Sequence, residues 1–345
     1  MTTTLTELPI VDMSLLDGDN AGRARFRRAL LEATHEVGFF YLVGHGIDRA
    51  TRERLFATVR AFFALPEEAK FDVEMLKSPH FRGYTRFGGE YTQGAIDWRE
   101  QIDLAAEYPS LGDDPGYLRL DGPNQWPALP GFREVITDWQ KRCGELGLSL
   151  MREWALSLGA DRAVFDDAFA ERPSTLMKLV RYPGRESATE RQGVGAHKDP
   201  GVLTLLLIEP GKGGLQVEHD GGWIDAPPVE DAFVVNIGEL MEYATDGYLK
   251  ATMHRVQSPP PGTERLSVPF FFNPALSSAM PRIELPTDLA ADAPGVTDDP
   301  DNPISGTFGE NMIKARLRAH PDVAARHHPD LARGGDDTPI PDKVS

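Results

Sequence analysis

The sequence predicts a mainly β protein with flanking helices, built around a sandwich or jelly roll of short strands. Two observations lead to this fold class. From Thr175 onward, short apolar segments are separated by Gly, Pro and Asp turns, which is typical of strands. Before that point, longer segments carry apolar residues at helical intervals. Because barrels and sandwiches often form one unit at this length, we expect residues 1–345 to form a single domain.

The N-terminal part, residues 1–170, is expected to be mostly helical with short strands. The predicted elements are, in order, a strand over 8–12, a helix over 21–37, a strand over 39–43 and helices over 52–64 and 131–158. Residues 78–94 are rich in Gly, Tyr, Thr and Arg and have no sustained period. This composition predicts a long surface loop, a kind of segment that often lines a site.

The β-rich core is predicted over residues 171–285. Its strands are expected over 177–182, 202–208, 214–217, 232–237 and 266–272. The C-terminal part, residues 286–345, is expected to begin in an acidic, Pro-rich loop that starts at 285 and runs to 303. A helix over 308–319 and a polar tail follow.

Charge and composition exclude several classes of protein. The 36 Lys and Arg residues face 53 Asp and Glu residues, a net charge of −17 that repels nucleic acid and anionic lipid surfaces. No apolar segment approaches the roughly 20 residues that span a bilayer. The lone cysteine, Cys143, cannot form an internal disulfide, and the N-terminus lacks the features of a signal peptide. We therefore expect a cytoplasmic protein with a small-molecule substrate and no nucleic-acid or membrane partner; the sequence leaves its oligomeric state open.

His197 and Asp199 form the first half of a candidate metal site. They stand two residues apart before a predicted strand, and in an extended chain such residues point to the same face. His254, which follows a later strand and turn, supplies a third ligand. Two histidines and one carboxylate leave three positions open on an octahedral metal, the signature of non-haem Fe(II) oxygenases. The open positions accommodate a bidentate ketoacid and O2.

Arg265 and Ser267 form a second candidate site at the start of the 266–272 strand. Their side chains point the same way, and a guanidinium with a hydroxyl suits one carboxylate, as at the far end of 2-oxoglutarate. The Tyr182 phenol is expected to add a hydrogen bond, and Lys178, on the same face of its strand, is expected to belong to the substrate pocket.

Other histidines match parts of this pattern without its context. The two sequences His320-Pro-Asp322 and His328-Pro-Asp330 also read His-x-Asp, but no strand and no Arg-x-Ser pair follows them. We interpret both as accidental matches. His45 lies between two glycines at a strand end and is interpreted as structural.

Taken together, these segments resemble the isopenicillin N synthase-like branch of the 2-oxoglutarate/Fe(II) oxygenases over nearly the whole chain. The similar stretches are Leu8-Pro-Ile-Val-Asp12, Gly38 to Gly46, Gly195-Ala-His-Lys-Asp199, Val235-Asn-Ile-Gly238, Met253-His-Arg-Val256 and Arg265-Leu-Ser-Val-Pro-Phe-Phe271. The family has a double-stranded β-helix, or jelly-roll, core. The resemblance implies that Arg265 and Ser267 bind the distal carboxylate of the cosubstrate with Tyr182 nearby, and that Leu206, Leu215 and Phe271 line the substrate pocket.

A further resemblance concerns the segment from Arg82 to Gly94. It is similar to a segment of bacterial ethylene-forming enzymes in which a Glu at the position of Glu90 contacts an arginine cosubstrate. This resemblance adds Tyr84 and Glu90 to the expected substrate pocket; a solvated loop with capping roles is the alternative interpretation.

The expected function is therefore an Fe(II)- and 2-oxoglutarate-dependent dioxygenase of secondary metabolism. It would oxidise an unactivated C–H bond of a small organic metabolite, by hydroxylation or desaturation, with release of succinate and CO2; Fe(II), 2-oxoglutarate and O2 are required, and ascorbate is allowed as an assisting reductant. Three alternatives stay open: a ketoacid-independent oxidase of the same fold, as in isopenicillin N synthase cyclisation, an ethylene-forming-type enzyme, and a non-catalytic metal- or ligand-binding β-helix protein.

Overall fold

The major sheet contains eight strands and forms the framework of the molecule. The computed structural model describes residues 6–185, 192–296 and 303–332. In sheet order, the eight strands are β1 (Ile10–Asp12), β2 (Phe39–Val43), β12 (Phe233–Ile237), β9 (Leu203–Ile208), β14 (Glu264–Phe272), β7 (Leu176–Pro183), β6 (Glu100–Ala105) and β3 (Gly83–Thr85). Only the β1/β2 pair is parallel; the other neighbours are antiparallel.

A second sheet of four strands completes the jelly-roll core that the sequence predicts. Its order is β11 (Gly222–Asp225), β10 (Leu215–His219), β13 (His254–Gln257) and β8 (Gln192–His197). A small hairpin, β4 (Tyr91–Thr92) with β5 (Ala95–Ile96), stands apart from both sheets. The mixed, sheet-rich architecture confirms the predicted fold class.

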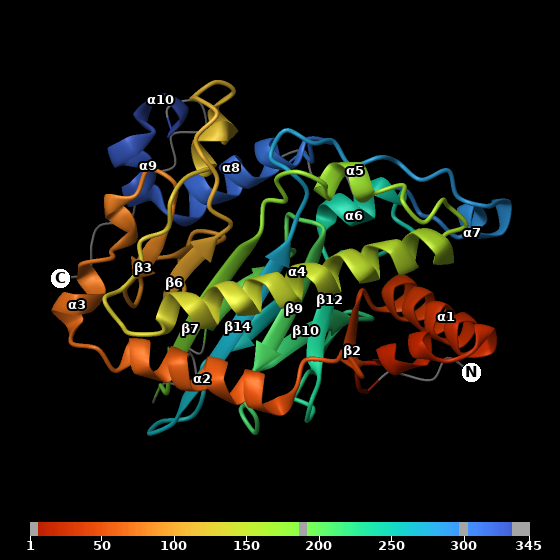
Figure 1. The fold of residues 1–345 in the computed structure, drawn as a ribbon, viewed down its shortest axis with the longest axis horizontal. Coiled ribbons are helices and arrows are strands. Elements are labelled where there is room, and N and C mark those ends of the chain that lie inside the picture. Colours follow the sequence, from red (N-terminus) through yellow and green to blue (C-terminus); the bar gives the residue numbers. More distant parts are fainter. Residues whose placement is uncertain (1–5, 186–191, 297–302, 333–345) are drawn as a thin grey trace.

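Helices cover the outer face of the major sheet and the edge formed by β6 and β3. In Figure 1, α1 (Asn20–Glu36), α2 (Arg49–Phe63) and α4 (Phe132–Ser157) lie over the major sheet, and α8 (Phe308–Ala319), α9 (Pro321–His327) and α10 (Pro329–Ala332) gather near β3 and β6. The short helices are α3 (Glu67–Phe71), α5 (Asp166–Phe169), α6 (Glu239–Ala244), α7 (Thr287–Ala291), η1 (Met13–Asp17), η2 (Met75–Lys77) and η3 (Gly116–Leu120). Aspartates cap the first two long helices: the Asp19 and Asp48 carboxylates accept the backbone N–H groups of Gly22 and Thr51.

Strand alternation divides the buried residues into two cores. Successive side chains on a strand point to opposite faces. On β14, Leu266, Val268 and Phe270 therefore join the core beneath the helices, while Arg265 and Ser267 point between the sheets. The same alternation on β7 places Leu179 under the helices and leaves Lys178 and Tyr182 on the inner face. The inner face of the jelly roll is thus where the sequence places its polar residues.

Three predictions for the flanking segments need correction. Residues 78–94 are not a surface loop: they contain β3 and β4, and Phe81, Arg82 and Tyr84 are buried. The expected loop at 285–303 contains α7 before residue 297, and its residues 297–302 lie outside the described part. The expected polar tail forms α9 and α10 up to Ala332, because His320 and His328 are buried against the preceding segments instead of solvated.

No helix among residues 6–185, 192–296 and 303–332 has the length and apolar character to cross a membrane.

Candidate metal centre and its cavity

His197, Asp199 and His254 meet at one end of the inter-sheet space. His197 ends β8 and His254 begins β13, and the two residues are paired directly across these antiparallel strands. The Oδ1 atom of Asp199 lies 3.6 Å from His197 Nε2 and 3.8 Å from His254 Nε2. Within the described part of the chain, this is the only cluster of three or more such residues whose ligand atoms could converge on one metal ion, all within 4.8 Å of one another.

The remaining polar atoms of the three side chains are already bonded to the protein. His197 Nδ1 lies 2.8 Å from the Gly195 carbonyl, and His254 Nδ1 lies 3.1 Å from the Thr252 carbonyl. Asp199 Oδ2 accepts hydrogen bonds from Thr204 Oγ1 and Asn236 Nδ2, at 2.5 and 2.8 Å. Two Nε2 atoms and one carboxylate oxygen are left facing one another. This donor set, oriented by outer partners, fits a divalent iron.

The protonation states of the cluster also suit a metal. Burial and the neighbouring His197 lower the pKa of His254 to about 4, so this imidazole is neutral and has a lone pair to donate. Burial alone would raise the pKa of Asp199, but the two histidines and the Asn236 amide hold it below its ordinary value. Burial opposes a charged His197, yet its contact with Asp199 raises the His197 pKa. A carboxylate beside a neutral imidazole is the form that binds a cation.

Arg265 is a buried cation that forms no ion pair within the described part of the chain. It is fully buried, and none of its three guanidinium nitrogens has a hydrogen-bond partner among the described residues. Its guanidinium lies 4.9 Å from the centroid of the Tyr182 ring, and Ser267 stands on the same inner face of β14. An unpaired buried charge is costly, so this geometry calls for an anionic ligand between Arg265 and the metal cluster.

One cavity of about 740 Å³ contains both features. That volume suits a bound cosubstrate together with a small substrate. The predicted pocket residues Leu206, Leu215 and Phe271 line this cavity, as do Tyr182, Lys178 and Glu90. Tyr84 does not: it packs against Phe62 and Phe71 in the helix-covered core, and its hydroxyl donates to Glu100 Oε2 at 2.6 Å. The expectation for Tyr84 fails because β3 turns this side chain away from the cavity.

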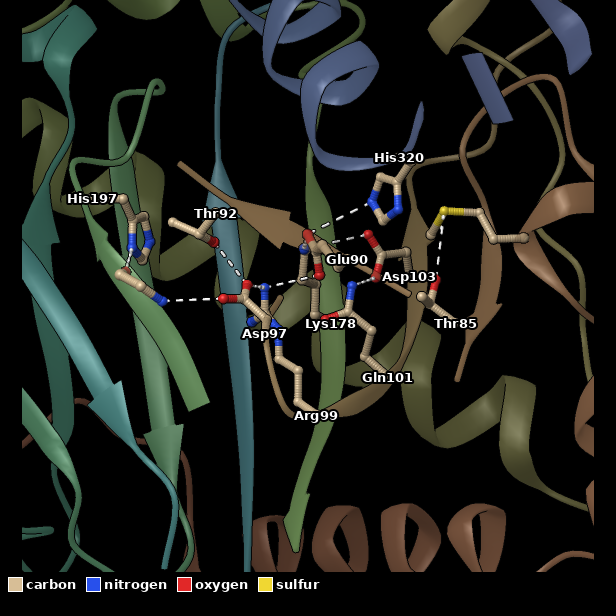
Figure 2. Close-up of polar contacts among 12 residues, drawn as sticks. Thr85, Glu90, Thr92, Asp97, Arg99, Gln101, Asp103, Lys178, His197 and His320 are labelled. Atoms are coloured by element: carbon tan, nitrogen blue, oxygen red, sulfur yellow. Dashed lines mark hydrogen bonds and ion pairs between the residues drawn. The ribbon is translucent and has the colours of Figure 1, made fainter. Parts of the chain in front are cut away.

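Charged residues of alternating sign stand at one side of the cavity, and Glu90, Arg99, Lys178 and Arg316 line it. Figure 2 shows the part of this series that runs from Asp97 to Asp103. Glu90 accepts from Lys178 Nζ at 2.7 Å and from Arg99 at 2.8 Å. Arg99 also contacts Asp97, and Lys178 lies 3.7 Å from Asp103. We call the set Asp97, Arg99, Glu90, Lys178, Asp103 and Arg316 the charged wall. Its three acids and three bases balance in charge.

The C-terminal helices complete this wall. Arg316 of α8 donates to Asp103 Oδ2 at 2.8 Å, and His320 Nε2 lies 3.6 Å from Glu90 Oε1. Met312 and Ala315 of α8 also line the cavity. The sequence reasoning missed Arg316, whose only signal is its place on a predicted helix face. His320 was interpreted as an accidental motif match, and neither it nor His328 belongs to a three-residue metal cluster in the described chain.

Comparison with known families agrees with this geometry. Residues 173–274 match the 2OG-Fe(II) oxygenase superfamily, and residues 8–129 match the family described as the non-haem dioxygenase in morphine synthesis N-terminal region. The second match covers the segment that contains Glu90 and Asp97, and the first covers the three candidate ligands and Arg265.

Individual proteins resemble almost the whole chain. A 2-oxoglutarate-dependent dioxygenase, frbJ, from Dothideomycetidae sp. (strain 11243) is 36% identical over 95% of this chain and 94% of its own length. A homoarginine-6-hydroxylase from Arabidopsis thaliana is 35% identical over 79% of this chain and 86% of its own. A full-length Neurospora crassa protein, crystallised in complex with alpha-KG and thymine, superposes with a TM-score of 0.73 at 29% identity, covering 94% of this chain and 98% of its own.

Proposed function

Because the chain belongs to the 2OG-Fe(II) oxygenase superfamily and is a 2-oxoglutarate-dependent dioxygenase, we propose that it oxidises a C–H bond of a small metabolite with both an anionic and a cationic group, such as a free amino acid. The charged wall carries this proposal. Glu90 offers a carboxylate to an ammonium or guanidinium group, and Lys178 beside it offers an ammonium to a carboxylate. A ligand whose own charges balance leaves the net charge at the charged wall unchanged.

The residue roles follow from the same geometry and belong to the proposal. His197, Asp199 and His254 would hold Fe(II), and Arg265, with Ser267 and Tyr182 on the same inner face, would hold the distal carboxylate of 2-oxoglutarate. When bound, iron, O2 and 2-oxoglutarate supply the oxidation, which yields succinate, CO2 and the oxidised substrate. Leu206, Leu215 and Phe271 would exclude water from the reacting C–H bond.

A named relative supports the substrate class. One protein 35% identical to this chain is a homoarginine-6-hydroxylase, which acts on an amino acid. Here Glu90 is already paired with Lys178 and Arg99, so a substrate cation must share this carboxylate with them. This arrangement favours an amino acid of balanced charge over a strongly cationic one. The relatives named as 2-oxoglutarate-dependent enzymes set aside the ketoacid-independent and non-catalytic alternatives.

The test is a panel assay for substrate-stimulated succinate formation. The metal-loaded protein is incubated with 2-oxoglutarate, O2 and either glutamine, citrulline, arginine, homoarginine or thymine. We expect an amino acid to stimulate succinate formation and to gain one oxygen or lose two hydrogens by mass spectrometry. Glu90→Gln should raise the KM for that amino acid about tenfold, the loss of one charge-assisted hydrogen bond, and leave the KM for 2-oxoglutarate unchanged. Stimulation by thymine alone would contradict the proposed substrate class.

A further inference from the structure

The segment from Glu90 to Arg99 covers the free edge of the strand that carries His197. Strand β8 is the last strand of the minor sheet, so among the described residues one of its edges has no partner strand. The backbone N–H of Trp98 donates to the Gln192 carbonyl at 3.2 Å, and the Asp97 carboxylate accepts the Gly195 N–H at 3.1 Å. Backbone groups that would otherwise be orphaned at this edge are therefore satisfied by the 90–99 segment.

This segment is closed on itself by polar contacts. The backbone N–H of Asp97 donates to the Glu90 carbonyl at 3.0 Å, and a single Arg99 nitrogen contacts both Glu90 Oε2 and Asp97 Oδ2, at 2.8 and 3.3 Å. Thr92 Oγ1 donates to Asp97 Oδ2 at 2.7 Å. Asp97 is fully buried. Its carboxylate thus connects Arg99 of the charged wall to the Gly195 N–H of β8, as Figure 2 shows.

Gly195 connects this junction to His197. Its N–H donates to Asp97, and its carbonyl accepts from His197 Nδ1 at 2.8 Å. A Cβ atom at Gly195 would lie only 3.0 Å from the Thr92 side chain, so the absence of a side chain permits this close approach. One glycine is therefore held from one side by Asp97 and orients the imidazole on the other.

We propose that Asp97 is a positioning residue for His197: it fixes the Gly195 backbone that orients the imidazole toward the metal. The inference rests on the proposed role of His197 as a metal ligand. Outer partners of a ligating histidine set its ring orientation and typically change metal affinity 10- to 100-fold. Asp97 does not touch the imidazole; it acts one hydrogen bond further from the metal, through the Gly195 backbone. Because Arg99 joins Asp97 to Glu90, one continuous series of hydrogen bonds connects Glu90, where a substrate would bind, to the metal ligand His197.

The test is the affinity and visible spectrum of Co(II) bound to the full-length protein, with no substrate or ketoacid. Co(II) takes the same ligands as Fe(II), and its visible bands respond to ligand geometry. Asp97→Ala should raise the Co(II) Kd about tenfold, the lower end of the range for outer partners, and alter the band shape. Asp97→Asn keeps one acceptor oxygen. This oxygen can accept either from the Gly195 N–H or from Thr92 and Arg99, but not from both sides, so the variant should give an intermediate Kd.

Glu100 provides the matched control. It is also fully buried, and its carboxylate binds Lys70, Tyr84 and Arg181 without contacting β8. Glu100→Ala and Glu100→Gln should lower the thermal stability of the metal-free protein as the Asp97 variants do, but should keep the wild-type Co(II) Kd and spectrum. Equal Co(II) binding by the Asp97 and Glu100 variants would overturn the inference.

Two further comparisons keep the result interpretable. If wild-type protein fails to bind Co(II), or if His197→Ala binds it normally, the proposed metal site itself is refuted. If Asp97→Ala does not fold, Thr92→Val decides the question, because it removes one donor to Asp97 and keeps the packing against Gly195. A wild-type Kd and spectrum in Thr92→Val and Asp97→Asn would then overturn the positioning role, and a raised Kd in both would support it.

Discussion

His197 and His254 face each other as a directly paired couple on the antiparallel strands β8 and β13, with ring centroids 4.2 Å apart. Each Nδ1 atom lies within hydrogen-bonding distance of a backbone carbonyl two residues earlier, at Gly195 and Thr252. The two strands therefore fix both rings with their Nε2 atoms toward Asp199. A metal bound there would satisfy both lone pairs at once.

We predict that His254→Ala weakens Fe(II) or Co(II) binding by more than about 100-fold, beyond the range caused by loss of an outer partner. Equilibrium dialysis of the metal-free protein measures this effect. His219→Ala is the control, because His219 is the last residue of β10 in the minor sheet and lies outside the cluster. Normal metal binding by the His254 variant would place the metal elsewhere.

A second prediction concerns the buried Arg265. We expect Arg265→Ala to raise the Kd for 2-oxoglutarate between about 10- and 100-fold, since hydrogen bonds to charged groups contribute about 1.5–3 kcal/mol each. Metal binding should stay unchanged. Anaerobic calorimetry of the metal-loaded protein gives both values. Arg255→Ala serves as the control, since the Arg255 guanidinium lies 4.0 Å from the exposed Trp223 ring and does not line the cavity. Wild-type affinity in the Arg265 variant would show that another group holds the cosubstrate.

The parts of the site that lie on regular strands could be predicted from the sequence. Period-two alternation places Arg265 and Ser267 on one face of β14, and it places Lys178 and Tyr182 on one face of β7. The register of β8 against β13 is not a local property, so sequence spacing gives only the types of the ligands and not their distances. The division into 1–170, 171–285 and 286–345 within a single domain stays a prediction.

The features that could not be predicted from the sequence depend on contacts with residues far away along the chain. Strand β6 was not predicted, because Glu100, Gln101 and Asp103 interrupt its apolar pattern; in the structure all six residues of β6 are buried, and the charged ones have charged partners. Arg316 and His320 reach the charged wall across more than 200 residues of sequence, as the Asp103–Arg316 contact illustrates. No periodicity of a single segment encodes such a pairing.

The Asp103–Arg316 ion pair leads to a third prediction. Both side chains are buried, so Arg316→Met would leave the Asp103 carboxylate with Lys178 at 3.7 Å as its nearest cation. We expect a loss of about 3 kcal/mol in the free energy of unfolding, because removal of one partner strands a buried charge. Urea denaturation measures it. The double variant Arg316→Met/Asp103→Asn should recover most of this loss; equal stability of the single and double variants would rule out the pairing as the cause.

A fourth prediction concerns the pH dependence of stability, which His320 should influence. This imidazole is buried, with Glu90, Asp103, Arg316 and Lys178 around it, and burial lowers its pKa to about 4 from 6.5. An unfolded chain binds a proton at this residue near pH 6.5, whereas the folded protein does so only near pH 4. The stabilising contribution is therefore complete above pH 6.5 and is lost as the pH falls toward 4. Its maximum is about 3 kcal/mol, at 1.36 kcal/mol per pKa unit.

We expect His320→Gln to flatten the fall in unfolding free energy between pH 6.5 and 4, measured by urea denaturation at several pH values. The slope should not vanish, because burial also lowers the pKa values of His45 and His328, and both contribute with the same sign. His219→Gln is the control and should leave the curve unchanged, since His219 is the last residue of β10 and lies outside the charged wall. A His320 variant with the wild-type slope would mean that the buried imidazole takes up its proton equally in both states, and that Glu90 compensates fully for its burial.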